Sequence, residues 1–205
     1  FENVPPADRA ELTQFMKELR AALAPSGYRV TMSVPAKHKD APTSAWVGAF
    51  DYYELGRVCD QVMIMTYDEH TSGTGPGPIA SLPWVEKVIK YAATQMPKRK
   101  ILLGVAAYGY DWNTSTNRAR AVTYQQAVAN AAKYGKKIQW DAEAATPHYR
   151  YKSGNVVREV WFESTDSLKA KLKLVERYGL GGIAIWRLGQ EDAGYWKLIQ
   201  KELLK

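Results

Sequence analysis

The 205-residue chain carries 28 Lys and Arg against 21 Asp and Glu, a formal net charge of +7, and 46% of its residues are hydrophobic. This composition is typical of a globular domain that buries a sizeable core, and it excludes a disordered or low-complexity chain. No apolar run approaches the roughly 20 residues that a membrane-spanning helix needs, so we predict no membrane span.

Charge and metal-binding residue types narrow the functional class further. The basic residues are scattered along the sequence apart from the cluster at 98–100, which favours a diffuse positive surface over a nucleic-acid-binding stripe. The single Cys59 excludes an internal disulfide and a cysteine-based zinc site, and the three histidines show no ligand spacing. We therefore predict no nucleic-acid partner, no metal and no cofactor.

Predicted helices and strands alternate along the chain. Apolar spacing predicts a helix over about 8–24, with Asp8 and Glu11 in a capping box, and then a strand over 28–34. The next expected elements are a helix at 51–55, a strand at 61–67, a helix from 83 to about 96, a strand at 101–107, a helix from 123 to about 134, period-two strands between 138 and 162, a helix at 167–178, a strand at 181–186 and a helix at 196–204. This alternation predicts a parallel sheet with covered faces. Because only about four strand–helix units can be counted, the pattern fits either half of a (β/α)8 barrel or a smaller open sheet.

Polar residues follow the central predicted strand at the point where it ends. The run from Val62 to Met65 is typical of a strand buried on both faces, and Tyr67, Asp68 and the two residues after them are polar or ionisable. A segment rich in Gly and Pro comes next, so these side chains lie at the carboxyl end of a strand, where parallel α/β folds bind ligands. Taken alone, this strand fits equally well a simple turn capped by Asp68.

Four short motifs, in the right order, resemble those of glycoside hydrolase family 18, the chitinase-like barrels. They are Phe1-Glu2-Asn3, similar to the tail of a D-x-x-D-x-D-x-E signature; Met65-Thr66-Tyr67-Asp68, similar to M-x-Y-D; Gly104 through Tyr108-Gly109; and Gly181-Gly182 through Trp186. The resemblance implies that residues 1–205 form the C-terminal half of a TIM (β/α)8 barrel. It also implies a small α+β insertion at 113–162, between the last two strands.

The resemblance assigns roles to individual residues. Glu2 corresponds to the general acid, Tyr67 to the residue that hydrogen-bonds the substrate's 2-acetamido group, and Asp68 to a carboxylate that helps bind the sugar and shapes the field around the acid. The expected substrate-binding residues are Met65, Tyr108 and Trp186, the last as the floor of a sugar subsite. In this family the acetamido oxygen attacks the anomeric carbon, so the configuration is retained without an enzyme nucleophile. Without the resemblance, Met65 and Tyr108 fit core packing as well.

Several segments look most like the bacterial spore cortex-lytic branch of the family, among them Glu-Asn-Val-Pro-Pro and Trp-Arg-Leu-Gly-Gln-Glu-Asp. The branch implies a polysaccharide substrate with β-linked N-acetylglucosamine, either peptidoglycan or a chitin oligosaccharide. It also implies a location outside the cell, at the cell wall or the spore. The alternative is a non-catalytic, lectin-like protein on the same scaffold, since family members that lose an acidic residue can become lectins.

Part of the family pattern falls outside the sequence. The family's carboxylate two residues before the catalytic Glu would precede Phe1, as would its first four strands. We therefore expect the 205 residues by themselves to have little or no hydrolase activity. We also expect the exposed strand edges of a half barrel to drive self-association or pairing with the other half.

Overall fold

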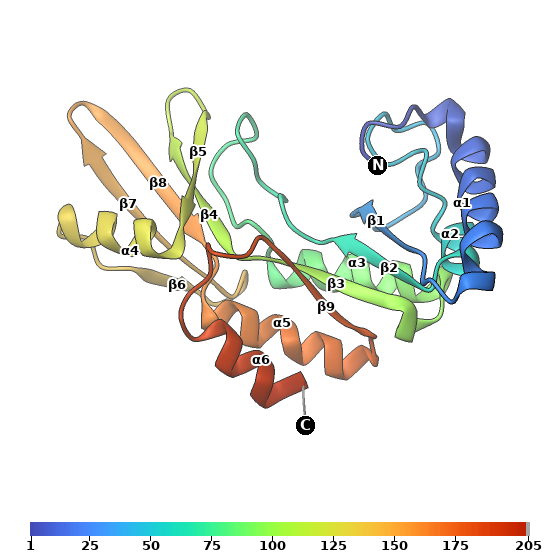
Figure 1. Cartoon of the computed structure of the whole chain (residues 1–205). Coiled ribbons are helices and arrows are strands. Elements are labelled where there is room, and N and C mark those ends of the chain that lie inside the picture. Colours follow the sequence, from blue (N-terminus) through green and yellow to red (C-terminus); the bar gives the residue numbers. More distant parts are fainter. Residues whose placement is uncertain (204–205) are drawn as a thin grey trace. The chain divides into compact units, whose positions relative to one another are not determined.

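The computed structural model describes residues 1–203, and its elements follow the predicted alternation of helices and strands (Figure 1). The chain divides into two compact units. The first comprises Phe1–Thr66, Glu86–Gly104 and Val175–Ala184, and the second comprises the rest of the described chain.

The first unit is organised on a four-stranded sheet with the order β1-β2-β3-β9. The strands are β1 (Thr31–Pro35), β2 (Gln61–Met65), β3 (Ile101–Ala106) and β9 (Gly182–Trp186), and the last residues of β3 and β9 belong to the second unit. β1, β2 and β3 run parallel, and their register aligns Val34 with Ile64 and Ile64 with Leu103. Each of these three side chains is at most 1% exposed, so they form one buried row across the sheet. The predicted parallel sheet with covering helices is confirmed.

Helices α1 (Arg9–Leu23) and α2 (Tyr52–Val58) lie side by side next to β1 (Figure 1). Asp51 caps α2 by accepting hydrogen bonds from the backbone N–H groups of Tyr53 and Glu54, at 3.0 and 3.1 Å. The predicted capping box at Asp8 is wrong, because Asp8 makes no side-chain capping bond. A 3-10 turn over Pro6–Asp8 leads directly into α1, and Asp8 therefore has φ −91° and ψ 22° in place of the extended backbone of an N-cap.

The remaining helices occupy the positions that the sequence pattern predicts. They are α3 (Leu82–Gln95), α4 (Tyr124–Lys133), α5 (Thr165–Tyr178) and α6 (Tyr195–Leu203), with short 3-10 turns at Ala24–Ser26 and Lys98–Lys100. The predicted last helix extends to Leu204, which lies outside the described residues. The predicted capping box at the start of α4 is confirmed, since the Thr123 side chain accepts from Gln126 N–H and the Gln126 side chain accepts from Thr123 N–H.

The second unit contains a five-stranded antiparallel sheet with the order β5-β4-β8-β7-β6. Its strands are β4 (Tyr108–Asn113), β5 (Ala119–Thr123), β6 (Gln139–Asp141), β7 (Thr146–Ser153) and β8 (Val156–Phe162). The predicted antiparallel strands between 138 and 162 are present. The sheet also includes β4 and β5, and its first residue, Tyr108, comes five positions before the predicted start of the insertion at 113.

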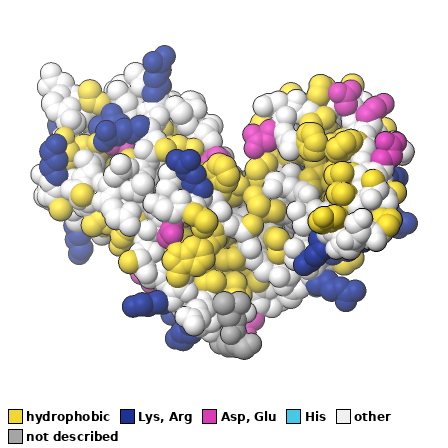
Figure 2. All heavy atoms as spheres, viewed as in Figure 1, with side chains coloured by type: hydrophobic (Ala, Val, Ile, Leu, Met, Phe, Trp, Pro, Cys, Tyr) yellow, Lys and Arg dark blue, Asp and Glu magenta, His cyan; other side chains and the backbone are white. Residues whose placement is uncertain are grey.

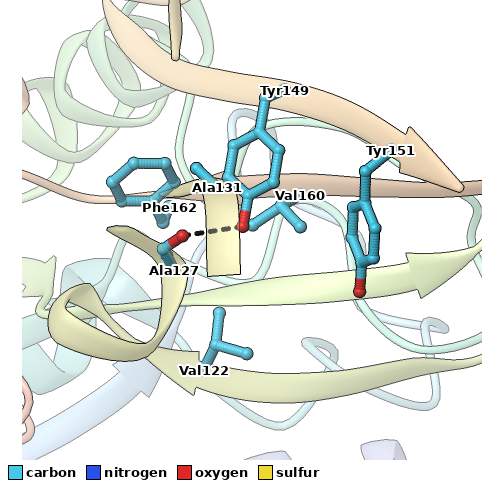
Figure 3. Close-up of a cluster of buried hydrophobic side chains, with 7 residues drawn as sticks. All are labelled: Val122, Ala127, Ala131, Tyr149, Tyr151, Val160 and Phe162. Atoms are coloured by element: carbon cyan, nitrogen blue, oxygen red, sulfur yellow. Dashed lines mark hydrogen bonds between the residues drawn. The ribbon is translucent and has the colours of Figure 1, made fainter. Parts of the chain in front are cut away.

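Helix α4 covers one face of this antiparallel sheet over a small core of its own (Figure 3). The core comprises Val122, Ala127, Ala131, Tyr149, Tyr151, Val160 and Phe162. Tyr149 is 1% exposed, and its hydroxyl donates to the Ala127 carbonyl at 2.7 Å, so this buried polar atom is satisfied by the helix that covers it.

Candidate active site

The candidate site is built on the residues that follow β2. The buried Thr66 hydroxyl donates to the Gly104 carbonyl at 2.6 Å, which holds the end of β2 beside β3. Two residues later Asp68 has φ +60°, in the left-handed region that Asp tolerates better than most residues. This conformation turns the chain into the loop before α3 and leaves the Asp68 side chain exposed.

Two tyrosine hydroxyls converge on the Asp68 carboxylate. Tyr108 donates to Oδ1 at 2.5 Å and Tyr110 donates to the same oxygen at 3.1 Å. Burial, together with the nearby Asp68 charge, raises the pKa of Tyr108 well above its usual range and raises the pKa of Tyr110 to about 12. Both hydroxyls therefore keep their protons at neutral pH and act as hydrogen-bond donors to the Asp68 carboxylate.

Aromatic rings continue along β4 from this carboxylate. Ring centroids lie 6.5 Å apart for Tyr67 and Tyr108, 5.6 Å for Tyr108 and Tyr110, and 5.4 Å for Tyr110 and Trp112, all in edge-to-face geometry. Tyr110 and Trp112 are absent from the predicted site residues. Their period-two spacing after Tyr108 was the available signal, because side chains two apart on a strand share one face.

A glycine allows β4 to approach its neighbour closely. Gly109 pairs with Phe162 of β8, and a Cβ added at Gly109 would lie 2.3 Å from the Phe162 Cβ and 2.4 Å from the Trp161 carbonyl oxygen. No side chain fits in this space. Gly109 therefore sets the position of the flanking Tyr108 and Tyr110 rings relative to the sheet.

The loop between β2 and α3 is tied back onto itself and onto β4. The Glu69 carboxylate accepts from the N–H of Ser81 at 2.7 Å and from its hydroxyl at 3.0 Å. The indole N–H of Trp112 donates to the Thr71 carbonyl at 3.1 Å. These bonds indicate that Glu69 stabilises the loop that carries Asp68.

Trp186 belongs to the same unit as these residues. Its carbonyl accepts the N–H of Ala107 at 2.8 Å, so its backbone lies beside the residue that precedes Tyr108. Its side chain is 54% exposed, and an exposed indole offers the flat apolar surface on which sugar rings stack.

Glu2 and Met65 belong to the first unit. Glu2 is exposed, and the neighbouring Phe1 ring packs edge-on against Phe15 of α1 with centroids 5.4 Å apart. Met65 is the half-buried last residue of β2. The structure thus brings together Tyr67, Asp68 and Tyr108, with Trp186 in the same unit, while the roles of Glu2 and Met65 stay predictions from their motifs.

Among residues 1–203, no group of three or more His, Cys, Asp or Glu side chains is arranged to hold a metal ion. Cys59 is a buried free thiol whose pKa is raised to about 11 by burial. Within the same described range, no helix is both long enough and apolar enough to cross a membrane.

Comparison with known proteins identifies the family. The model of glycosyl hydrolases family 18 matches residues 2–191. The chain belongs to this family. The four-stranded sheet with its helices is accordingly part of the family 18 (β/α)8 barrel, as the motifs predicted.

Similar family 18 proteins act on bacterial spore cortex or are chitinases. A cortical fragment-lytic enzyme of Bacillus anthracis is 35% identical over 204 residues, which cover 97% of this chain and 47% of that protein. The crystal structure of the Bacillus cereus spore cortex-lytic enzyme SleL matches 98% of this chain and 48% of its own, with 36% identity and a TM-score of 0.92. A chitinase structure from Chromobacterium violaceum matches 100% of this chain and 65% of its own, with 33% identity and a TM-score of 0.93. The chain therefore spans about half the length of the curated relatives that it matches.

Proposed function

We propose that this chain is part of a retaining glycoside hydrolase that cleaves β-linked N-acetylglucosamine in peptidoglycan of the spore cortex or cell wall. The relatives' names point to cortex and chitin glycans, and the family membership points to a glycosidase. A protein that acts on wall glycan works outside the cell, at the wall or the spore.

Glu2 is the proposed general acid. It protonates the glycosidic oxygen as the bond from that oxygen to the anomeric carbon breaks, and the substrate's own acetamido oxygen attacks the anomeric carbon from the opposite face. Water then attacks the same carbon, gives its proton to the Glu2 carboxylate and restores the acetamide. Tyr67 hydrogen-bonds the acetamide, Asp68 helps bind the sugar and shapes the field around Glu2, and Met65, Tyr108 and Trp186 contact the sugar.

The hydrogen bonds from Tyr108 and Tyr110 to Asp68 carry this proposal. They hold one carboxylate in a fixed position at the carboxyl end of a parallel strand, with the Tyr67 ring beside Tyr108. A carboxylate that is positioned in advance can bind the sugar and shape the field around the acid without rearrangement during the reaction. A carboxylate that served only to cap a turn would not need two tyrosine donors from another strand.

The protein to be assayed contains these 205 residues in a polypeptide as long as the matched relatives. The assay measures the reducing sugar that it releases from peptidoglycan. Replacing Glu2→Gln removes the proton but keeps the size, and we expect a loss of kcat of about 100- to 10,000-fold. Glu11→Gln, at an exposed position on α1, is the matched control and keeps full activity. Unchanged hydrolysis by the Glu2→Gln protein would contradict the assignment.

Two further measurements separate the alternatives. Proton NMR of the first product distinguishes retention, which gives the β anomer, from inversion. Tight binding of the glycan without hydrolysis would instead support the lectin-like alternative. The 205 residues assayed alone are expected to show little or no hydrolysis.

The same isolated chain is expected to self-associate or to pair with the remainder of a barrel. In the described sheet β1 and β9 are the edge strands, and Trp186 and Leu188, at the end of β9 and just beyond it, are 54% and 67% exposed. Light scattering coupled to gel filtration measures the mass in solution, and a monodisperse monomer would contradict the expectation.

A further inference from the structure

More than half of the net positive charge of this chain lies in the segment that forms the antiparallel sheet. Residues 108–162, which form this sheet and α4, contain eight Lys or Arg and four Asp or Glu, a net charge of +4 out of +7 for the whole chain. Lys and Arg side chains, dark blue in Figure 2, recur over the part of the molecule that holds β5, β7, β8 and α4. This segment therefore has a local excess of positive charge.

A cavity of about 360 Å³ opens on this layer, between α4 and strands β5, β7 and β8. Its apolar floor includes Val122 and Val160 from the buried cluster of Figure 3. Its polar rim includes Arg120, Lys133, Gln126 and Asn130. Of the described residues that line the cavity, none is acidic. The volume is within the range of small-ligand pockets.

The Asp111 carboxylate, which binds Arg120 of the rim, carries one negative charge against two positive charges. Asp111 is 0% exposed and accepts from Arg120 at 3.0 and 2.7 Å and from Arg158 at 2.8 Å, so two guanidinium groups share one carboxylate. The Arg120 side chain remains 63% exposed, which leaves part of its guanidinium accessible to a ligand. The other acidic residue on these strands, Glu159, is bonded to Arg150 at 2.6 Å and to the Trp161 indole N–H at 2.7 Å.

The rim is also fixed in place. The Asn130 amide donates to the Tyr149 hydroxyl at 3.1 Å, and that hydroxyl donates to the Ala127 carbonyl, so helix and strand hold one another. Asp111 likewise fixes the direction of the Arg120 guanidinium. Donors that are positioned before a ligand arrives lose little side-chain entropy when they bind it.

We propose that this cavity binds a carboxylate that carries a short aliphatic group. The planar guanidinium of Arg120 and the Lys133 ammonium provide the charge that a carboxylate needs, and the Val122 and Val160 floor accepts a methyl-sized group. Resting on the proposed function, the ligand is a carboxylate on the wall glycan. Its source is either the peptide attached to the sugar or the lactyl group of the sugar itself.

Isothermal titration and two-dimensional NMR of the full-length protein test this proposal by binding alone. The probes are the N-acetylglucosaminyl-N-acetylmuramyl tetrapeptide, the free tetrapeptide, the peptide-free disaccharide with its lactyl carboxylate, and neutral di-N-acetylchitobiose. We expect shift changes at the cavity residues with the tetrapeptide-bearing disaccharide and none there with the neutral disaccharide. Binding of the free tetrapeptide assigns the peptide as source, and binding of the peptide-free disaccharide assigns the lactyl group.

Two exposed alanines on α4 provide a matched pair of variants. Ala129 lines the cavity, while Ala132 is not among the lining residues. Ala129→Glu places a negative charge against the ligand carboxylate, and we expect affinity to fall roughly tenfold or more. Ala132→Glu has the same charge change on the same helix and leaves affinity within about twofold, because an exposed charge outside the cavity is screened. Lys133→Gln is expected to weaken binding by up to roughly fivefold.

Three outcomes overturn the proposal. They are no saturable binding up to about 10 mM probe, equal loss of affinity in Ala129→Glu and Ala132→Glu, and a DNA oligonucleotide that binds the cavity residues as well as the carboxylate probes do. Each is independent of hydrolysis. A protein that fails to cleave peptidoglycan but binds the probe at the cavity would refute the proposed function and keep the cavity assignment, and the converse result would do the reverse.

Discussion

The parallel and antiparallel sheets of this protein differ in where their polar residues lie along the strands. In β2 the strand interior is apolar, with Val62 and Ile64 buried, and polar groups follow only where the strand ends. In β7 polar and buried side chains alternate, so that Tyr149 and Tyr151 point to the core while Arg150 and Lys152 are exposed. The parallel sheet concentrates chemistry at one edge, whereas the antiparallel sheet spreads charge over a whole face.

Buried polar groups show the same contrast. Just after β2, the buried Thr66 hydroxyl donates to a carbonyl of the neighbouring strand β3. In the antiparallel sheet Asp111 is fully buried and is satisfied by two arginines and by the Tyr151 hydroxyl at 2.8 Å. The second arrangement is more sensitive to mutation, because each partner depends on the others.

The largest effect is expected from Asp111→Ala. The change leaves the largely buried Arg158 and the buried Tyr151 without their shared acceptor, and breaking a buried ion pair costs about 3–5 kcal/mol. Urea unfolding measures the loss, and hydrogen exchange shows whether the antiparallel sheet opens first. Glu143→Gln, at an exposed position, is the control and is expected to stay within about 0.5 kcal/mol of the unmodified protein.

An intermediate effect is expected from Gly109→Ala. The new Cβ would overlap β8 backbone and the Phe162 Cβ, so the strands must separate, at a cost of about 1–3 kcal/mol. Gly154→Asn is the control: Gly154 lies in the β7–β8 turn at φ +58° with open space around it. It tests whether replacing any glycine of this sheet lowers the free energy of unfolding by the same amount. Equal destabilisation by both changes would show that close strand approach at Gly109 is unimportant.

The smallest effect is expected from Tyr110→Phe, which removes one hydrogen bond to Asp68 and about 1 kcal/mol of stability at pH 7. The raised pKa also has a consequence at high pH. Because the folded Tyr110 titrates near 12 and an unfolded tyrosine near 10, the unfolded chain releases its proton first, and stability falls as pH rises from about 10 to 12.

The Tyr110→Phe variant lacks this contribution to the dependence of stability on pH. Urea midpoints at pH 7 and pH 11, with absorbance titration of the tyrosinates, measure both effects. Tyr28→Phe, at a residue 65% exposed, is the control. An identical pH slope for the two variants would refute the raised pKa of Tyr110.

Strong, local sequence patterns predicted most elements of both sheets. The apolar runs gave β2 and β3, and the alternation in 138–162 predicted β7 and β8. Strand β5 was not predicted because only Val122 of its five residues is buried, which leaves no alternation to detect. Strand β4 was not predicted, because a single residue, Ala107, separates it from β3 and its residues were interpreted as the polar end of that strand.

Residues of the candidate site that belong to sequence motifs could be predicted. Those that join the site only through contacts between distant parts of the chain could not. Tyr67, Asp68, Tyr108 and Trp186 came from motif order. The Tyr110 bond to Asp68 joins residues 42 apart, and the Arg158 bond to Asp111 joins residues 47 apart. Pairings over such separations depend on strand register, which single-sequence patterns do not specify.

Three hydrogen bonds join the segment between β2 and α3 to the segments of the antiparallel sheet, and they bear on how the length of these segments varies within the family. Gly73 N–H donates to the Asn117 carbonyl at 2.8 Å, Ala119 N–H to the Ser72 hydroxyl at 3.0 Å, and Leu82 N–H to the Ala144 carbonyl at 3.0 Å. The first and third of these bonds join main-chain atoms, which do not depend on residue type, so substitutions leave those two bonds intact while insertions and deletions break them; the second also needs the Ser72 hydroxyl. We expect the loop at 69–81 and the turns near 117 and 144 to change length together across family members, because an insertion in one would break its hydrogen bonds to the other.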